Sequence, residues 1–330
     1  MFYLVNSFPA AIFCAPAACI EEPPVARPLV IGSRGSQLAL VQSQMVRKLL
    51  QTRHPQLEVT IEIIRTKGDV AAGSLRSFGG QGVFTGQIED ALLAGRIDLG
   101  VHSLKDLPTR FHDDLALVAT PQREDVRDVL VGPVGCCLDQ LPAGAHMGTG
   151  SLRRRAQLLA LRPDLEFVDI RGNIDTRIGR VATGDCTAVV LAAAAFHRLG
   201  WRDKISAYLE VDQVMPAPGQ GSLGLQMRRG DDLAVYVEVL NHAPTFAAVG
   251  AERSLLRSLG AGCHAPVGAW GRLQDQVLHL DGRVGSPDGR RLIQADISGP
   301  VAAARDLGAD LAQQLKDQGA SAILEEAASA

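Results

Sequence analysis

Four short segments combine cationic, hydroxyl, carboxylate and thiol side chains at spacings that could do chemistry. The first is the run Ser33-Arg34-Gly35-Ser36, between an expected strand and an expected helix. The N-terminus of a helix offers free N–H groups and the positive end of the helix dipole, so it suits an anion. The Arg34 guanidinium adds a fork that matches a carboxylate. The alternative is that Ser36 only caps the helix.

The second segment runs from His102 to Pro108 and follows the carboxyl end of an expected strand, where ligands of open α/β sheets bind. It contains Ser103 and the adjacent pair Lys105 and Asp106. In the functional interpretation, Asp106 is partly buried and handles a proton or a developing cation. The alternative is a solvated pair on a loop, which stabilises the fold little.

The third region is rich in arginine and contains two expected helix starts. Residues 151–180 hold seven arginines against four acids, a local excess of three positive charges in a chain of net charge −3. Arginines at helix starts favour a site for several carboxylates. Phosphate or nucleic-acid contacts and a salt-bridged surface are the alternatives. The residues of interest are Thr149, Ser151, Arg153, Arg154, Arg155, Arg171 and Arg177.

The fourth segment, Leu259 to Pro266, places Cys263 among glycines and before a proline, as on a loop. An exposed thiol there could be a nucleophile or an attachment point. A buried, inert cysteine is the alternative. The adjacent His264 does not turn it into a metal site, because two neighbouring ligands make no tetrahedron. The vicinal Cys136 and Cys137 are equally weak, so we expect no metal.

Alternating strands and helices are expected to position these segments. Apolar residues at period two predict strands, and recurrences at three and four residues predict helices, such as one with Leu38, Val41, Met45 and Leu49 on one face. The short links between them predict doubly wound α/β layers. The expected strands are 29–33, 57–63, 97–101, 129–131, 166–170, 187–191 and 222–227, with helices at 85–94, 152–161 and 174–182. From about residue 244 we expect a helix at 246–259, strands near 267, at 277–280 and at 292–297, and a helix at 302–317.

These elements divide into two doubly wound α/β domains and a small C-terminal α+β domain. The polar residues 121–128 predict a hinge, and Gly219–Gly221 predict a return crossing. We therefore expect domain 1 at 28–121 and 222–240, domain 2 at 122–221, and domain 3, with Cys263, at 244–330. Residues 1–27 are expected to be a disordered or non-native extension, and the glycine-rich residues 67–83 a mobile loop.

Composition narrows the class of protein. The 330 residues are 46% apolar and 21% charged, which excludes a largely disordered chain. A net charge of −3 and 4% aromatics argue against a nucleic-acid coat. We find no apolar run of the roughly 20 residues that a membrane helix needs. Six cysteines without paired spacing favour a reducing, cytoplasmic setting.

Together, six stretches resemble the porphobilinogen deaminase (hydroxymethylbilane synthase) family: SRGSQLAL, VHSLKDLPT, GTGSLRRRAQL, DIRGNIDTRI, PAPGQGSLGL and GAGCHAPVG. They follow one another in order between residue 29 and about residue 270. The resemblance implies three domains, the first two like periplasmic binding proteins, and a dipyrromethane cofactor on Cys263 through a thioether. It also implies that four porphobilinogen molecules are joined head to tail with loss of ammonia. Hydrolysis then releases hydroxymethylbilane, in tetrapyrrole (porphyrin, heme) biosynthesis.

The resemblance also implies roles for single residues. Asp106 would be the catalytic carboxylate, with Lys105 beside it, and Gln220 would contact substrate. The chain would be a monomer. The implied carboxylate binders are Arg34, Arg153, Arg154, Arg171, Arg177 and Arg198, and the implied hydrogen-bonding groups are Ser36, Ser103, Lys105, Thr149 and Ser151.

The chain departs from the family pattern at five positions, which are Gln81, Gly86, Gln87, Gly150 and His264. The first three replace charged residues in and after the glycine-rich loop, so they bear on turnover more than on fold. One alternative is therefore a catalytically impaired, deaminase-like two-lobed binding protein for multi-carboxylate ligands. A nucleic-acid binder that uses Arg153–Arg155 is a second alternative, opposed by the low aromatic content.

Overall fold

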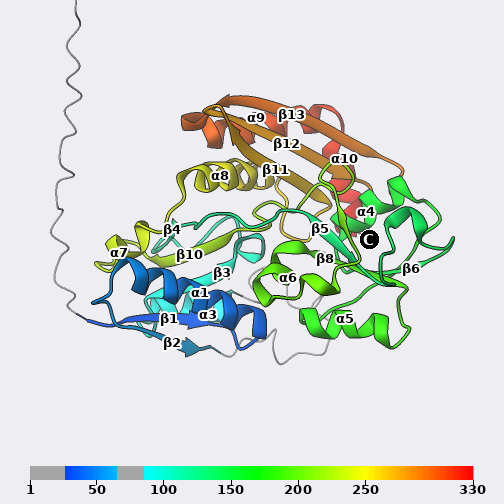
Figure 1. The fold of residues 1–330 in the computed structure, drawn as a ribbon. Helices are drawn as coiled ribbons and strands as arrows, with labels where there is room; N and C mark the ends of the chain where they lie inside the picture. The colour runs from blue at the N-terminus through cyan, green and yellow to red at the C-terminus, as the bar shows by residue number, and fades with distance from the viewer. Residues whose placement is uncertain (1–26, 65–84, 330) are drawn as a thin grey trace, which may run out of the picture.

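The structure is a computed structural model that describes residues 27–64 and 85–329. The expected N-terminal extension up to Ala26 and the glycine-rich segment 67–83, with Gln81, lie outside these residues. Figure 1 shows three groups of elements: a blue-to-cyan sheet and its helices, a green group beside it, and an orange sheet with red helices above both.

The first group consists of β1 (Leu29–Ser33), α1 (Gln37–Arg53), β2 (Val59–Ile63), α3 (Gly86–Leu93), β3 (Leu99–Ser103), β4 (Leu115–Ala119), β10 (Leu223–Arg228) and α7 (Ala234–Glu238). Its sheet has the order β2-β1-β3-β10-β4. β1 pairs in parallel with β2 and β3, whereas β10 pairs antiparallel with β3 and β4. The chain that returns from the second group therefore supplies an interior strand of the first sheet, β10, which lies between β3 and β4.

The second group consists of β5 (Asp128–Val131), β6 (His146–Gly148), α4 (Leu152–Leu161), β7 (Glu166–Val168), α5 (Ile174–Ala182), β8 (Ala188–Ala192), α6 (Ala193–Leu199) and β9 (Ala207–Leu209). Its sheet has the order β7-β6-β8-β5-β9, with β5 antiparallel to both neighbours. Both sheets thus hold parallel strands with helical connections and one inserted antiparallel strand. The expected pair of doubly wound α/β domains is confirmed.

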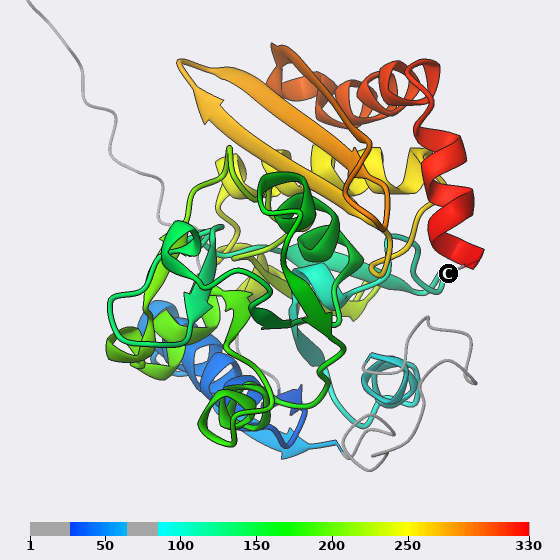
Figure 2. The ribbon, with the colours of Figure 1, turned by 90° about the vertical axis from the view of Figure 1, so that its right-hand side faces the viewer.

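The third group consists of α8 (Ala243–Ser258), β11 (Val267–Gln274), β12 (Val277–Gly285), β13 (Leu292–Pro300), α9 (Ala304–Asp317) and α10 (Ala320–Ser329). The three strands form an antiparallel sheet in chain order. Asp275 and Gln276 join β11 to β12 with φ of 47° and 64°, the left-handed pair typical of a tight hairpin. Fully buried Leu255, Leu280 and Leu311 belong to one core, so helices and sheet form a small α+β unit (Figure 2).

The helices Leu152–Leu161 and Ile174–Ala182 and the strand Leu29–Ser33 are confirmed with their expected bounds. The helix is confirmed, but the apolar face that we expect for α1 is not the most buried one. Met45 and Leu49 are 40% and 41% exposed, whereas Gln42, Val46 and Leu50 face the interior. The buried face of α1 includes the polar Gln42, which hydrogen-bonds to a residue of a distant strand. A pattern of apolar residues alone therefore indicates the adjacent face of the helix. The sequence patterns do not predict β4, β6, β9, α6, α7 and α10, most of which are only three to seven residues long.

Arg27 belongs to the folded part of the chain, although we expect the extension to include it. Its Nη1 lies 2.7 Å from the Oδ1 of Asp98, a buried carboxylate that also accepts from the Val30 N–H at 2.9 Å. Asp98 pairs in addition with Arg228 Nη2 at 2.8 Å. The first described residue therefore joins the start of β1 to the start of β3.

The chain crosses between the first two units twice, at residues 121–128 (the first crossing) and at residues 219–221 (the second, or return, crossing). A buried carboxylate on α8 joins the third unit to both crossings. Glu252 Oε1 lies 2.6 Å from Arg123 Nη1, in the first crossing, and its Oε2 accepts from the Gly219 N–H, in the second, at 2.6 Å. Its Oε1 also accepts from the Gly271 N–H at 2.7 Å, on β11. This carboxylate is fully buried, and Arg123 is 11% exposed.

Neutralising this carboxylate is expected to destabilise the protein. Glu252→Gln leaves the buried Arg123 cation without its partner, which costs about 3–5 kcal/mol. Thermal unfolding of the variant should therefore show a clear fall in Tm. Glu166→Gln serves as the control, because Glu166 pairs with a histidine on the surface. An unchanged Tm for Glu252→Gln would show that this carboxylate does not join the units.

Candidate active site

The second chemical segment ends β3 and continues into one turn of 3-10 helix, Leu104–Asp106, called η2. At the end of β3, Ser103 Oγ accepts a hydrogen bond from Gln42 Nε2 of α1 at 3.0 Å. Leu104 is fully buried, and its N–H donates to Ser222 O at 2.9 Å. Asp106 is therefore an exposed carboxylate on a turn that is held from two sides.

The return crossing contacts η2 at Gly219. This residue has φ of 78°, which favours glycine. A Cβ there would lie 3.2 Å from Leu104 Cγ and 3.3 Å from Lys105 N. The crossing between the α/β units is thus in direct contact with the backbone that carries Lys105 and Asp106.

Lys105 is half-buried at the junction of the two α/β units. Its Nζ donates to Gln220 Oε1 at 3.3 Å. Burial lowers the pKa of Lys105 to about 8. The charge of Arg154 acts in the same direction, whereas the carboxylates of Asp106 and Asp128 oppose it. Lys105 therefore changes charge close to physiological pH.

The sequence analysis missed Asp128, a fully buried carboxylate at the start of β5. Its Oδ1 lies 2.7 Å from Arg154 Nη2, and its Oδ2 lies 2.8 Å from Arg153 Nη2. Gln220 Nε2 donates to Oδ1 at 2.9 Å. The pKa of Asp128 is held well below its usual range by these arginines, which outweigh its burial. The sequence does hold one sign of this role. Asp128 is an acid at the start of an apolar strand, and the adjacent Arg153 and Arg154 need a counter-ion if they are buried.

Two expected binding residues have their side chains bound within the protein. Arg153 is 3% exposed and donates from Nη1 to Met215 O at 2.7 Å, in addition to its pairing with Asp128. Gln220 is fully buried and also donates to Val126 O at 2.8 Å. Both side chains are therefore used to hold neighbouring groups of the protein in place and are not open to a ligand.

Arg154 differs from Arg153 in one respect. Its Nη1 donates to Val190 O at 2.9 Å and its Nη2 to Asp128 Oδ1, but its Nε is buried and has no partner among the described residues. An unsatisfied buried donor costs about 1–3 kcal/mol, so this edge of the guanidinium suits an incoming acceptor.

Arg171 and Arg177 lie at the start of α5. Arg177 Nε donates to Gly172 O at 2.8 Å, and Arg171 pairs with Asp169 at 3.1 Å on the surface. Burial lowers the pKa of Arg177, the charge of Arg154 lowers it further, and the charge of Asp106 opposes this shift. Arg177 is thus electrostatically coupled to Arg154 and Asp106.

Cys263 lies on the loop between α8 and β11 and is exposed. Partial desolvation raises the pKa of its thiol, and the negative charge of Asp106 raises it further. Asp106 of the η2 turn and Cys263 of the third unit are therefore near enough to interact electrostatically. Residues 106, 177 and 263 belong to three different units, and the Asp106 charge acts on both of the others.

The expected hydroxyl groups lie at helix starts. Ser36 Oγ accepts from the Ala39 N–H at 3.4 Å and caps α1. Ser151 Oγ accepts from the Arg154 N–H at 3.4 Å and caps α4, and Thr149 Oγ1 accepts from the Ser151 N–H at 3.2 Å. These bonds fix the helix starts that carry the arginines, and the structure shows no further role for them.

Arg34 and Arg198 lie at two other points of the junction. Burial, helped by the charge of Arg34, lowers the pKa of His102 to about 4. Arg198, at the end of α6, donates to Gly221 O at 2.6 Å. Burial lowers the pKa of Arg198 to about 10. Arg198 therefore holds the return crossing next to Gln220.

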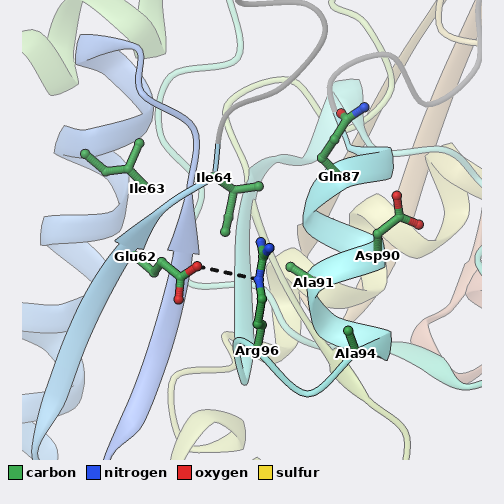
Figure 3. Close-up of a pocket in the computed structure, with 8 residues that line it drawn as sticks. All are labelled: Glu62, Ile63, Ile64, Gln87, Asp90, Ala91, Ala94 and Arg96. Carbon is green, nitrogen blue, oxygen red and sulfur yellow. Dashed lines mark ion pairs between the residues drawn. The ribbon is translucent and has the colours of Figure 1, made fainter.

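Two cavities lie away from these residues. One of about 510 Å³ lies between the end of β2 and α3, next to Glu62, Gln87 and Arg96 (Figure 3). It places Gln87, one of the departures from the family pattern, at the side of the first sheet. The other, of about 530 Å³, lies along the first crossing near Arg127 and Trp270.

Within residues 27–64 and 85–329, no cluster of three or more histidine, cysteine or acidic side chains could hold a metal ion. In the same part of the chain, no helix is long and apolar enough to cross a membrane. The basic run is not a continuous surface patch, because Arg153 and Arg154 are buried and only Arg155 is exposed. That observation removes the main support for the nucleic-acid alternative.

The fold and the site define a two-lobed α/β protein, to which a third unit adds an exposed cysteine on a loop. The model of the "porphobilinogen deaminase, dipyromethane cofactor binding domain" matches residues 29–235, and that of the "porphobilinogen deaminase, C-terminal domain" matches residues 246–317. The chain belongs to the porphobilinogen deaminase family.

Individual relatives agree with this assignment. A porphobilinogen deaminase of Thermus thermophilus is 46% identical over 300 residues, which is 90% of this chain and 98% of that one. One of Syntrophus aciditrophicus is 46% identical over 297 residues, 89% of this chain and 97% of that one. Among solved structures, a VFT2 domain of Bordetella pertussis BvgS aligns with TM-score 0.39 and 16% identity, over 64% of this chain and 85% of that one. The family is one of transferases of tetrapyrrole synthesis with a dipyrromethane cofactor.

Proposed function

We propose that this chain is an active hydroxymethylbilane synthase (EC 2.5.1.61). It joins four porphobilinogen molecules head to tail, releases one ammonia for each, and frees the linear hydroxymethylbilane by hydrolysis. The observation that carries the proposal is the electrostatic interaction of the Asp106 carboxylate with the Cys263 thiol and with Arg177, which the Arg154 charge also influences.

The residues present fit the dipyrromethane group. Cys263 offers an exposed thiol for the thioether, and the partnerless Nε of Arg154 offers a donor to a carboxylate. Each pyrrole of the group carries an acetate and a propionate, which guanidinium forks bind well. When bound, the group supplies the nucleophilic pyrrole carbon that starts the chain.

The arginines divide into two roles. Arg34, Arg154, Arg171 and Arg177 bind carboxylates of the cofactor and of porphobilinogen. Arg153, Arg198 and Gln220 hold the crossings and Arg154 in place. The hydroxyls of Ser36, Ser103, Thr149 and Ser151 keep the helix starts and the η2 turn fixed, so that bound carboxylates meet preorganised donors.

Asp106 is the catalytic carboxylate. When porphobilinogen loses ammonia it becomes an electron-poor, cationic azafulvene, and a carboxylate beside the pyrrole stabilises that charge. The same carboxylate accepts a proton when the new carbon–carbon bond restores the aromatic ring. Exposure of Asp106 at the end of a rigid turn lets it reach successive substrates.

The chain is proposed to act as a monomer in the cytoplasm, where its unpaired cysteines stay reduced. Domain 1 comprises 28–121 and 222–240, domain 2 comprises 122–221, and domain 3 comprises 244–330. Crossings at two places let the first two domains shift as the product grows.

Lys105 gives a pH dependence with a defined sign. Its ammonium is present below pH 8 and is lost as pH rises through its pKa of about 8. We therefore expect kcat/KM to fall on the alkaline side near pH 8. Lys105→Arg keeps the charge at higher pH and should remove that limb. A Lys105→Arg enzyme with the same alkaline limb would contradict this role.

The proposal is tested by incubating the protein with porphobilinogen and measuring ammonia and hydroxymethylbilane. We expect four ammonia molecules for each bilane released. Binding of porphobilinogen without release of ammonia would instead support the impaired binding protein, for which the uncharged Gln81, Gly86 and Gln87 are the sequence argument.

A further inference from the structure

Asp128 is a buried carboxylate that the assigned chemistry does not use. It is the first residue of β5, where the chain enters the second sheet, and it is fully buried. It lies among three groups from two other elements: Arg153 and Arg154 of α4, and Gln220 of the return crossing. Burial of one carboxylate with two guanidinium groups is costly unless each group is well placed.

A continuous chain of contacts leads from this carboxylate to both sides of the site. On one side, Arg154 is fixed by Asp128 and by Val190 O, so that its Nε edge is the donor left for a ligand. On the other side, Gln220 donates to Asp128 and accepts from Lys105 Nζ at 3.3 Å. Asp128 thus contacts the cation of one lobe directly and that of the other lobe through one amide.

We propose that Asp128 is a positioning residue for the transferase reaction, a shared counter-ion that orients Arg154 and, through Gln220, keeps Lys105 in place as an ammonium. The inference rests on the proposed function of the site. Asp128 touches neither substrate nor cofactor, and its effect passes through Arg154 and Lys105.

The electrostatics of Lys105 agree with this geometry. The charges that face Lys105 are Asp106 on its own turn, Asp128 on β5, and Arg153 and Arg154 on α4. The two carboxylates favour the ammonium and the two guanidinium groups oppose it. Loss of the Asp128 charge leaves Asp106 alone against two arginines, so the pKa of Lys105 must fall below about 8.

The test uses Asp128→Asn, which keeps size and removes the charge. We expect a fall in kcat of about 100-fold from the misplaced Arg154. We also expect the alkaline limb of kcat/KM to shift to lower pH. Asp98→Asn is the matched control, because Asp98 is 3% exposed and paired with two arginines in the first sheet, away from the site. Both variants should lose stability, but only Asp128→Asn should move the limb.

A second variant covers the case in which Asp128→Asn does not fold. Gln220→Leu keeps the Asp128–arginine pairs but removes the amide that links Asp128 to Lys105, together with its hydrogen bond to Val126 O. It should therefore also shift the limb to lower pH. An unmoved limb in every folded variant of Asp128 and Gln220, or the same shift in Asp98→Asn, would overturn the proposal.

A measurement without turnover separates this inference from the proposed function. Lys105 is one of five lysines, so its amine can be titrated by ¹³C NMR after reductive methylation and assigned with Lys105→Arg. In the Cys263→Ser background, Asp128→Asn should lower the pKa of the Lys105 amine. That result would uphold the positioning role even if the parent released no bilane, and an unchanged pKa would refute it.

Discussion

Asp106→Asn is expected to reduce the rate of bilane formation by about 10²–10⁴-fold, the range for loss of a general acid–base group. Asparagine has nearly the same size, but it neither carries the charge that stabilises a cationic pyrrole nor accepts its proton. Because Asp106 is exposed, the change should alter the free energy of unfolding by less than about 0.5 kcal/mol. Single-turnover ammonia release on protein of matched cofactor content measures the effect.

Asp113→Asn is the control for this prediction, since Asp113 is another exposed acid of the same lobe. It should retain the parent's rate. A normal rate for Asp106→Asn would place the catalytic carboxylate elsewhere. A rate lost together with the fold would show that Asp106 is structural, so thermal unfolding accompanies the assay.

Cys263→Ser is expected to abolish both the covalent cofactor and turnover while leaving the protein folded. The serine hydroxyl is a far weaker nucleophile than a thiolate, so no stable link to a pyrrole forms. Cys263 is exposed, so the substitution costs little stability. Cys137→Ser, at a half-buried cysteine of the second unit, should keep both the cofactor and turnover.

The raised pKa of Cys263 adds a second expectation to this prediction. Partial desolvation and the Asp106 charge keep the thiol protonated at neutral pH, so the thiolate fraction grows as pH rises toward its pKa. Loading of cofactor-free protein by porphobilinogen should therefore be faster at pH 8.5 than at pH 7. A loading rate that is independent of pH would show that attack by the thiolate does not limit the attachment.

Sequence patterns locate the groups that face the ligand better than the groups that hold them. Asp106 and Cys263 follow a strand end and a glycine-rich loop, which are local signals. Asp128, Gln220 and Glu252 act through partners up to 129 residues away in the chain. The residues next to them in the sequence do not indicate which partners these are. Arg153 shows the opposite error, since its neighbours suggest a ligand contact and its guanidinium is bound inside the protein.

The secondary structure shows the same difference between features that depend on nearby residues and features that depend on distant ones. The bounds predicted for the helix Ile174–Ala182 are correct, because its apolar face and its ends depend on residues within and next to the helix. The buried face of α1 is not predicted, because Gln42 is buried to reach Ser103, on a strand that is distant in the sequence. The order of the strands in each sheet likewise depends on the two crossings, which local periodicity does not encode.

The most direct test of the account is the intact mass of the protein purified from cells, before and after porphobilinogen is added, with Cys263→Ser beside it. The account predicts a parent heavier than its sequence by two linked pyrrole units. Porphobilinogen should then add a series of species, each one pyrrole unit heavier, and the variant should keep its bare mass. A parent that carries no pyrrole, and takes up none with porphobilinogen, would contradict the central claim.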